Sequence, residues 1–287
     1  MLLESGAALL VGITLVAATV NGALGYGFSS LTVPVALLAY SSRVLSPALV
    51  LVEVVLNCYV LVVNRGSLGT VWRRMIPVIV GLFPGVLAGS FALAHVAPGA
   101  LKLCTYLVLL PLILLQAAGI RRPVQSEKLL GLPVGFSVGT LYAVTTISGP
   151  PLALMMNNQG FVKQEFRAGL GVVRVVESTL TAASYYFLGL FTVESLQLLP
   201  LIVPSVAIGL PVGVFLIRRM NSETFRRICM SFDAWVVGFG LSRALLENGV
   251  LPEPTAYGAL ALTALVDCVL LVMFFTGRRP EVAVVSH

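Results

Sequence analysis

Apolar residues fill the chain almost from end to end, and short polar stretches divide them into successive runs. A helix needs about 20 apolar residues to cross a bilayer, and most of the runs reach that length. Two runs are too short, because a helix rises only about 1.5 Å per residue; we expect each to be a half-helix that pairs with the preceding segment. The approximate bounds are 5–24, 29–40 (short), 44–63, 75–97, 99–119, 129–148, 149–159 (short), 166–189, 196–217, 228–246 and 255–276.

Two similar breaks, one in each half of the chain, come directly before or within the start of the short runs. The first break extends from Gly25 to Pro34, and the second from Thr145 to Leu152. Opened backbone in lipid is tolerated only where protein or a water-filled cavity surrounds it. Paired segments interrupted by Gly and Pro are the best sequence indication of a binding site in a transporter. The alternative is that the breaks only let helices kink or pack closely.

The composition excludes a soluble domain and indicates a multi-pass membrane protein. Hydrophobic residues make up 58% of the 287 residues, charged residues only 10%, and the mean hydropathy is +0.99. The first residues, Met1 to Glu4, contain no basic group. We therefore expect the first run to be a retained helix in the lipid bilayer rather than a cleaved signal peptide.

The charged loops predict the orientation of the chain. Loops rich in Lys and Arg remain on the cytoplasmic side of the membrane. This rule predicts a protein of the cell inner membrane with its N-terminus outside and its C-terminus in the cytoplasm. It also explains the net charge of +6 without nucleic-acid binding. The basic stretches are 65–74, 121–128, 218–227 and the tail after Phe275, and the acidic ones are 190–197 and 247–254.

The two halves align with each other, which predicts an internal repeat. Leu31 corresponds to Leu152 and Glu53 to Arg174 at an offset of 121 (152 − 31 and 174 − 53). Equivalent loops carry opposite charge, as in 65–74 and 190–197, which indicates inverted topology. The alternative is chance identity among Leu, Val and Gly.

The expected fold class is therefore all-α. It is a polytopic membrane protein with two inverted-topology repeats, interrupted short helices and one appended C-terminal helix. The expected divisions are 1–120, 121–250 and 251–287.

Four short motifs carry a resemblance to a known family. Each half contains a Gly-x3-Gly helix, and the second half adds a Ser-Gly-Pro-Pro start and a small-residue helix. With these motifs the chain resembles the sulfite exporter TauE/SafE family of membrane permeases. The resemblance implies a transporter of sulfite, sulfonates or other small organic sulfur anions across the inner membrane. The motifs are Gly85–Gly89, Gly209–Gly213, Ser148–Leu152 and Phe166–Gly169.

The breaks offer a site for an anion. Ser148 can cap a helix, Pro150 is tolerated in its first turn, and the free N–H groups and the positive end of the helix dipole attract negative charge. The serines of the first break offer the same design. Adding polar side chains near the breaks gives the candidate substrate-binding residues, which are Gly27, Ser29, Ser30, Ser148, Gly149, Pro150, Arg174 and Asn57.

Charges deep in the apolar runs form a second group of candidates. Arg174 is expected to hold the substrate, and Glu53 or Glu177 to bind a coupling proton, because a charge at such depth normally faces a cavity or a partner. The alternative is a structural Arg–Glu network, and the two roles can coexist. For Asp267 we expect a structural ion pair with Arg243.

The sequence indicates a carrier without a cofactor or metal rather than an enzyme, because it contains none of the catalytic motifs for hydrolysis or phosphate binding. The four cysteines lie in apolar runs and show no metal-binding spacing. The expected function is alternating-access transport of a small sulfur anion, with protons as a candidate coupling ion. Alternatives are a permease for another small anion, such as a carboxylate, and an anion channel. The oligomeric state stays open, a homodimer being one arrangement.

Overall fold

A computed structural model describes residues 2–63, 65–118, 127–158, 163–217 and 222–276, and this part of the chain is helical with no strand. The prediction of an all-α membrane protein is therefore confirmed. The first half contains α1 (Leu2–Leu24), α2 (Phe28–Ala36), α3 (Ser42–Val63), η1 (Arg65–Ser67), α4 (Leu68–His95) and α5 (Pro98–Ala117).

The second half repeats a similar order of long and short helices. Its elements are α6 (Glu127–Thr145), α7 (Gly149–Asn158), α8 (Lys163–Phe187), α9 (Val193–Leu196), α10 (Leu199–Ile217) and α11 (Ser222–Glu247), followed by η2 (Thr255–Tyr257) and α12 (Gly258–Phe275). By length and composition, seven segments in the described part could cross a membrane. They lie in α1, α3, α4, α5, α9–α10, α11 and η2–α12.

The two short runs form short helices. α2 has 9 residues and α7 has 10, so they extend about 14 and 15 Å, roughly half of the hydrocarbon core. The preceding breaks need unusual backbone. Gly25 and Gly27 have φ angles of 82° and 104°, which suit glycine, and Thr146 has a φ of 57°. α2 begins at Phe28, so Pro34 lies inside this helix rather than in its first turn.

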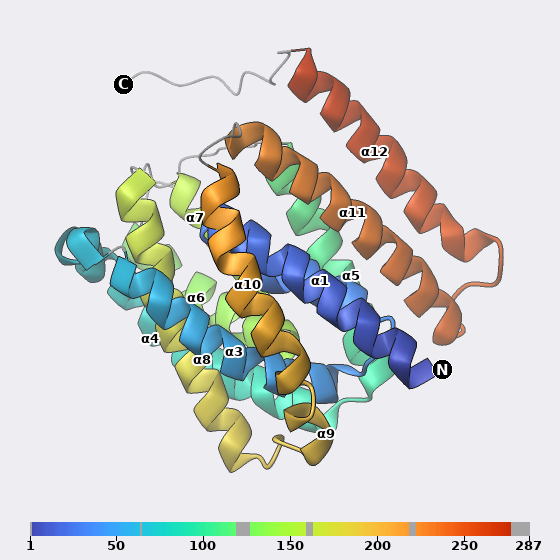
Figure 1. Ribbon diagram of the computed structural model, residues 1–287, viewed down its shortest axis with the longest axis horizontal. Helices are drawn as coiled ribbons and strands as arrows, with labels where there is room; N and C mark the ends of the chain where they lie inside the picture. Colours follow the sequence, from blue (N-terminus) through green and yellow to red (C-terminus); the bar gives the residue numbers. More distant parts are fainter. Residues whose placement is uncertain (1, 64, 119–126, 159–162, 218–221, 277–287) are drawn as a thin grey trace.

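Glycines bring two pairs of helices into direct backbone contact. α4 packs along α6, and α1 packs along α10 (Figure 1). A Cβ at Gly85 would collide with the carbonyl oxygen of Phe136, and one at Gly213 would collide with that of Thr19. The Gly-x3-Gly motifs therefore act as packing surfaces of the kind common between membrane helices. In the remainder of the bundle, α3 packs against α8, and α11 packs against α5 and α12.

The contact between α11 and α12 corrects one sequence prediction. Asp267 pairs with Arg227 at 2.8 Å rather than with Arg243, which instead lies 3.4 Å from Glu247. The reason is register. α12 runs antiparallel to α11, and Ser242 already lies beside Leu260, so Asp267 lies near the beginning of α11. Arg227, which the sequence placed in a basic loop, is only 3% exposed.

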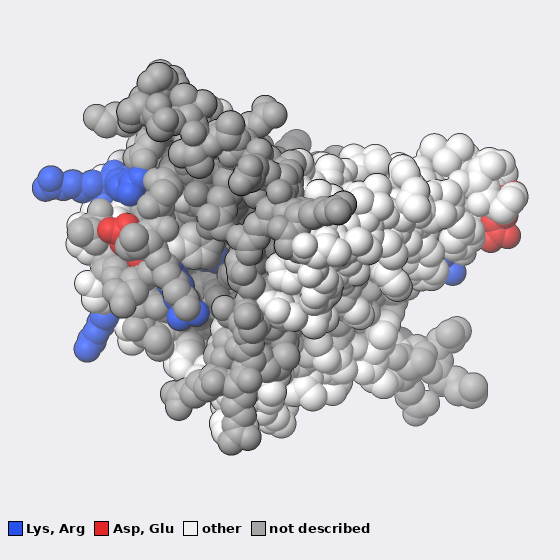
Figure 2. Space-filling model, turned by 90° about the horizontal axis from the view of Figure 1, so that it is seen from above, with Lys and Arg blue, Asp and Glu red and all other residues white. Residues whose placement is uncertain are grey.

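The charged residues at the surface lie mainly at the two ends of the bundle. Figure 2 shows most of the visible Lys and Arg side chains at one end, a mainly acidic patch at the other and uncharged residues between them. In Figure 1, η1 lies at the left and the end of α12 at the top, whereas the start of α1 and the α11–α12 connection lie at the right and α9 at the bottom. The belt between the ends exposes large apolar side chains, as a lipid-facing surface does.

Candidate functional site

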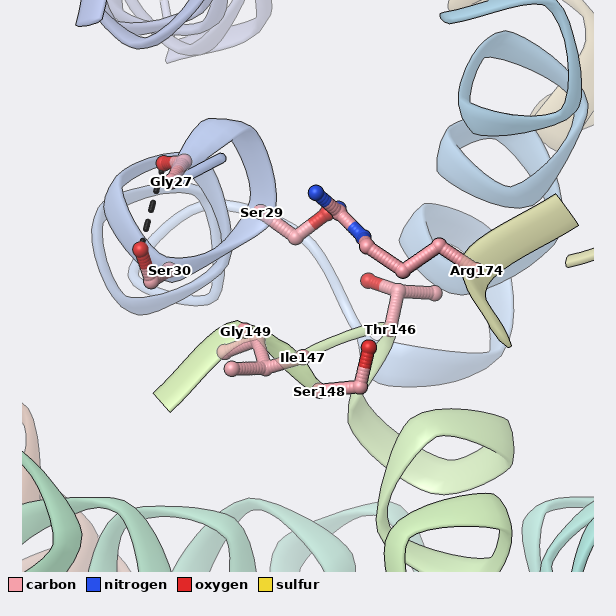
Figure 3. Close-up of a pocket in the computed structure, with 8 residues that line it drawn as sticks. All are labelled: Gly27, Ser29, Ser30, Thr146, Ile147, Ser148, Gly149 and Arg174. Carbon is pink, nitrogen blue, oxygen red and sulfur yellow. Dashed lines mark hydrogen bonds between the residues drawn. The ribbon is translucent and has the colours of Figure 1, made fainter. Parts of the chain in front are cut away.

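The two breaks meet at one buried pocket, although they lie more than 100 residues apart in the sequence. The pocket is small, with a cavity volume of about 10 Å³. Figure 3 shows the Arg174 side chain extending from α8 toward Ser29, above the residues of the second break in this view. The lining consists of Gly27, Ser29 and Ser30 from the first break, Thr146, Ile147, Ser148 and Gly149 from the second, and Arg174.

Both short helices present their N-termini to this pocket. In α2 the first backbone bond runs from Leu31 N–H to the Gly27 carbonyl, and no side chain caps the helix, so the N–H groups of its first turn have no intrahelical acceptor. In α7 the first backbone bond joins Leu152 to Ser148, and the two prolines before Leu152 have no N–H. Gly149 therefore supplies the N–H of that turn. Two positive dipole ends thus face the same space.

Glu53 of α3 joins four helices beside the pocket. Its Oε1 accepts hydrogen bonds from Ser29 of α2 at 2.5 Å and from Arg174 of α8 at 3.0 Å. Its Oε2 accepts a bond from the hydroxyl of Tyr142 on α6 at 2.6 Å. Both carboxylate oxygens therefore have partners, and the Glu53 side chain is fully buried. A buried polar group that is fully hydrogen-bonded in this way avoids most of the cost of burial.

Glu177 differs from Glu53 because it lacks a full set of partners. Its Oε2 accepts a hydrogen bond from Ser148 at 2.6 Å, while its buried Oε1 has no hydrogen-bond partner. Glu177 lies one turn after Arg174 on α8, and Arg174 already pairs with Glu53 at 3.0 Å. The Nε of Arg174 also has no partner. The site therefore contains one unpaired acceptor and one unpaired donor on neighbouring turns of the same helix.

The charges of this site do not balance within the group. One guanidinium is shared by two buried carboxylates, and Arg174 is only 4% exposed. A buried charge that lacks a partner is strongly unfavourable in a low-dielectric surrounding.

The structure brings together six of the eight predicted substrate-binding residues in the pocket lining: Gly27, Ser29, Ser30, Ser148, Gly149 and Arg174. Pro150 lies in the first turn of α7, but its side chain is outside the described residues. Asn57 does not line the pocket; its Nδ2 donates to the Arg174 carbonyl at 3.3 Å and to Ser178 at 3.4 Å. It thus links α3 to α8 at Arg174 and at Ser178, one turn further along α8.

Sequence reasoning missed three residues of the site. Thr146 and Ile147 line the pocket, and Tyr142 binds Glu53. Thr146 and Ile147 belong to the recognised break, but a positive φ at a threonine could not be foreseen. Tyr142 lies one turn before the break on α6, and this closeness to the break was the only feature of the sequence that could have identified it as a residue of the site. Within the described ranges, no three His, Cys, Asp or Glu side chains are grouped to hold a metal ion.

Comparison with models of known protein families shows which family the chain matches. The model of the family described as sulfite exporter TauE/SafE matches residues 10–239, well over half of the chain. The searches of curated proteins and of solved structures each gave no significant match. The match includes both breaks, both glycine-packed helix pairs and every residue of the pocket. The chain therefore belongs to the sulfite exporter TauE/SafE family of membrane transporters.

Proposed function

We propose that the protein is a secondary transporter that moves a small sulfur-containing anion, such as sulfite or an organosulfonate, across the inner membrane by alternating access. The observation that carries this proposal is the convergence of two helix N-termini and Arg174 on one buried pocket. Family membership supports transport rather than catalysis. Residues 1–120 and 121–250 then form two inverted repeats around this site, with 251–287 appended.

The size and donors of the pocket favour a compact anion with several oxygens. The cavity volume is about 10 Å³, room for about one water molecule, so the pocket suits a compact ligand rather than a bulky one. Arg174 Nε, the Gly149 N–H and the N–H groups of the first turn of α2 are donors from different directions. A sulfite or sulfonate group has more acceptor oxygens than a carboxylate and can satisfy more of these donors at once. This difference favours a sulfur oxyanion over a carboxylate.

Helix packing supports the inverted repeat. If α1 corresponds to α6 and α4 to α10, then the α1–α10 and α4–α6 contacts are equivalent, and both rely on glycines. Glu53 and Arg174, which correspond by position, form an ion pair at the interface of the halves. Alternating access in such transporters is a rocking of one helix bundle against another around a fixed site; here α1 with α10 and α4 with α6 would form the two bundles, because each pair is held together by glycine contacts. The contact between α3 and α8 is then the centre of that motion.

Coupling to protons is proposed to use Glu177 rather than Glu53. A serine hydroxyl has only one hydrogen to donate, and Ser148 currently gives it to Glu177 at 2.6 Å. A proton on Glu177 would turn the carboxyl into the donor and free the Ser148 hydrogen for the anion. The same proton would offset the negative charge of the substrate. Glu53 is less suited, since both of its carboxyl oxygens already accept hydrogen bonds, from Arg174 and from two hydroxyls.

Flux measurements in proteoliposomes test this function. We expect saturable uptake of labelled sulfite, competition by methanesulfonate and weak competition by acetate. An inward-directed proton gradient should accelerate uptake, and Glu177→Gln should remove this acceleration. Glu194→Gln makes the same chemical change at an exposed position and serves as the matched control. Stronger competition by acetate would indicate a carboxylate permease, a non-saturating current would indicate a channel, and absence of flux for every anion would refute transport.

Labelling of introduced cysteines tests the proposed orientation, with the N-terminus outside and the C-terminus in the cytoplasm. Arg73 and Glu194 are exposed, so cysteines at these positions in a cysteine-free background should react with a membrane-impermeant reagent from the cytoplasmic and the outer side, respectively. Arg226 is expected to behave like Arg73, although its side chain is outside the described residues. Reaction of position 73 from outside would reverse the orientation.

A further inference from the structure

A third buried carboxylate lies near the pocket, and the roles assigned so far do not use it. Asp233 is in the middle of α11, a helix that spans residues 222–247, and it is only 7% exposed. Its Oδ1 has no hydrogen-bond partner. An ionisable side chain at such depth in a membrane helix is a functional candidate by default, because an isolated charge is expensive there.

Asp233 is connected to the pocket through one residue. Its carboxyl group lies beside Ser30 on α2, and α11 packs against α2. Ser30 lines the pocket, and its hydroxyl donates to the Gly27 carbonyl at 3.2 Å (Figure 3). The arrangement repeats that of Glu177, which contacts the pocket through Ser148. A carboxyl group therefore lies behind a serine in each of the two breaks.

The other titratable groups around Asp233 supply no described counter-charge. Cys229 lies one turn earlier on α11 itself. From α5, the Tyr106 hydroxyl is engaged with the Pro34 carbonyl at 2.9 Å. From α12, Asp267 is held by Arg227, and η2 adds only Tyr257, while α1 presents no titratable side chain among those described. Within this part of the structure, Asp233 forms no ion pair.

We infer that Asp233 binds a second coupling proton and transmits its presence to the substrate through Ser30; this inference rests on the proposed function of anion transport. When Asp233 is ionised, it competes for the single hydrogen of the Ser30 hydroxyl. When a proton from solvent occupies Oδ1, the carboxyl group is neutral and the Ser30 hydrogen is available to an oxyanion. The transporter then carries its anion with two protons, one on Glu177 and one on Asp233.

The first experiment measures accumulation of labelled sulfite in proteoliposomes under an imposed pH gradient with the membrane potential clamped. Each coupled proton multiplies the accumulation ratio by about tenfold per unit of pH gradient. Asp233→Asn should therefore lower this ratio about tenfold per pH unit and still bind sulfite. Asp267→Asn makes the same change away from the pocket and should leave the ratio of the folded protein unchanged. An unchanged ratio in Asp233→Asn overturns the inference.

A second experiment needs no variant, so it also covers the case in which Asp233→Asn does not fold. Asp233 and Asp267 are the only aspartates in the sequence, so carboxyl-¹³C aspartate labels just these two groups. We expect infrared difference spectra of the wild-type protein to show a labelled carboxyl becoming protonated when sulfite is added. Absence of any labelled band change on sulfite binding refutes Asp233 as a proton site while leaving transport intact. Failure of sulfite to bind at all would instead refute the proposed function.

Discussion

The described part of the protein buries two arginine–carboxylate pairs of similar geometry in different surroundings. The nitrogen–oxygen distances are 3.0 Å for Arg174–Glu53 and 2.8 Å for Arg227–Asp267, and none of the four side chains is more than 5% exposed. The first pair borders a pocket that residues of both breaks line, and Glu53 accepts a hydrogen bond from Ser29 of the first break. The second is enclosed between α11 and α12, where Trp235 donates to Asp267 at 3.0 Å.

This comparison shows that the ion pair alone does not define a role. Both pairs carry the desolvation penalty of buried charges, and both contain unpaired arginine nitrogens, Nε in Arg174 and both Nε and Nη1 in Arg227. Only Arg174 lines a pocket into which helix N-termini point. We therefore assign substrate binding to the first pair and helix docking to the second, and variants of each can separate these roles.

The largest effect is expected for Arg174→Ala. It removes the pocket cation and leaves Glu53 buried without its charge partner, so we expect loss of sulfite flux together with a destabilisation of about 3–5 kcal/mol. Arg174→Lys should retain part of the flux but lose forked recognition of two oxygens. Thermal unfolding in detergent and flux in proteoliposomes measure the two losses separately.

The double variant Arg174→Gln, Glu53→Gln decides whether the two roles are separate. Removal of both charges should restore stability close to that of the wild type, because neither partner is left unpaired. Flux should remain absent. Recovery of flux together with stability would show that Arg174 is purely structural, and the helix ends would then hold the anion alone.

A similar loss of stability, without loss of transport, is expected for Arg227→Gln. Asp267 then keeps only Trp235 and Ser231 as partners, and the unpaired charge should reduce stability by about 3–5 kcal/mol. Flux per folded molecule should stay near the wild-type value, because the pair lies away from the pocket. A fall in specific flux with normal stability would contradict the contrast between the two pairs.

The smallest effects are expected from removing one neutral donor at each pair. Tyr142→Phe and Trp235→Phe each leave one carboxylate oxygen without its hydrogen bond, with an expected loss of about 1–3 kcal/mol. Only Tyr142→Phe should also change the apparent affinity for sulfite, since it alters the environment of Glu53 beside Arg174. Equal effects of both variants on the affinity for sulfite would contradict the assignment of substrate binding to the Arg174–Glu53 pair alone.

The elements of the site could be predicted from sequence because they depend on local chemistry. Glycines and prolines in the middle of apolar sequence indicate an interrupted helix, and the short runs after them are visible in α2 and α7. The offset of 121 related Glu53 to Arg174 before any contact was known, and the two are paired in the structure. A charge deep in an apolar run needs a partner, which made this pair foreseeable.

What could not be predicted depends on register between helices. The predicted partner of Asp267 was wrong, because Arg227 and Arg243 lie at opposite ends of α11 and only the antiparallel register of α12 decides which of them Asp267 meets; the sequence pattern does not show that register. Tyr142 and Asp233 were missed as neighbours of the site for the same reason. The position of Asn57 also required the structure, since an amide on α3 could equally point to the pocket or, as observed, to α8.

The glycine contacts have a mechanical consequence. Where a carbonyl of one helix occupies the place of a missing side chain on another, as at Gly85 and Gly213, there is no deformable layer between the two backbones. Close-packed contacts of this kind resist sliding. We therefore expect α1 with α10, and α4 with α6, to move as two rigid helix pairs. Any large rearrangement must then be concentrated in the short helices and at the crossing of α3 and α8. The parts of the chain that hold the ligand would also be its hinges.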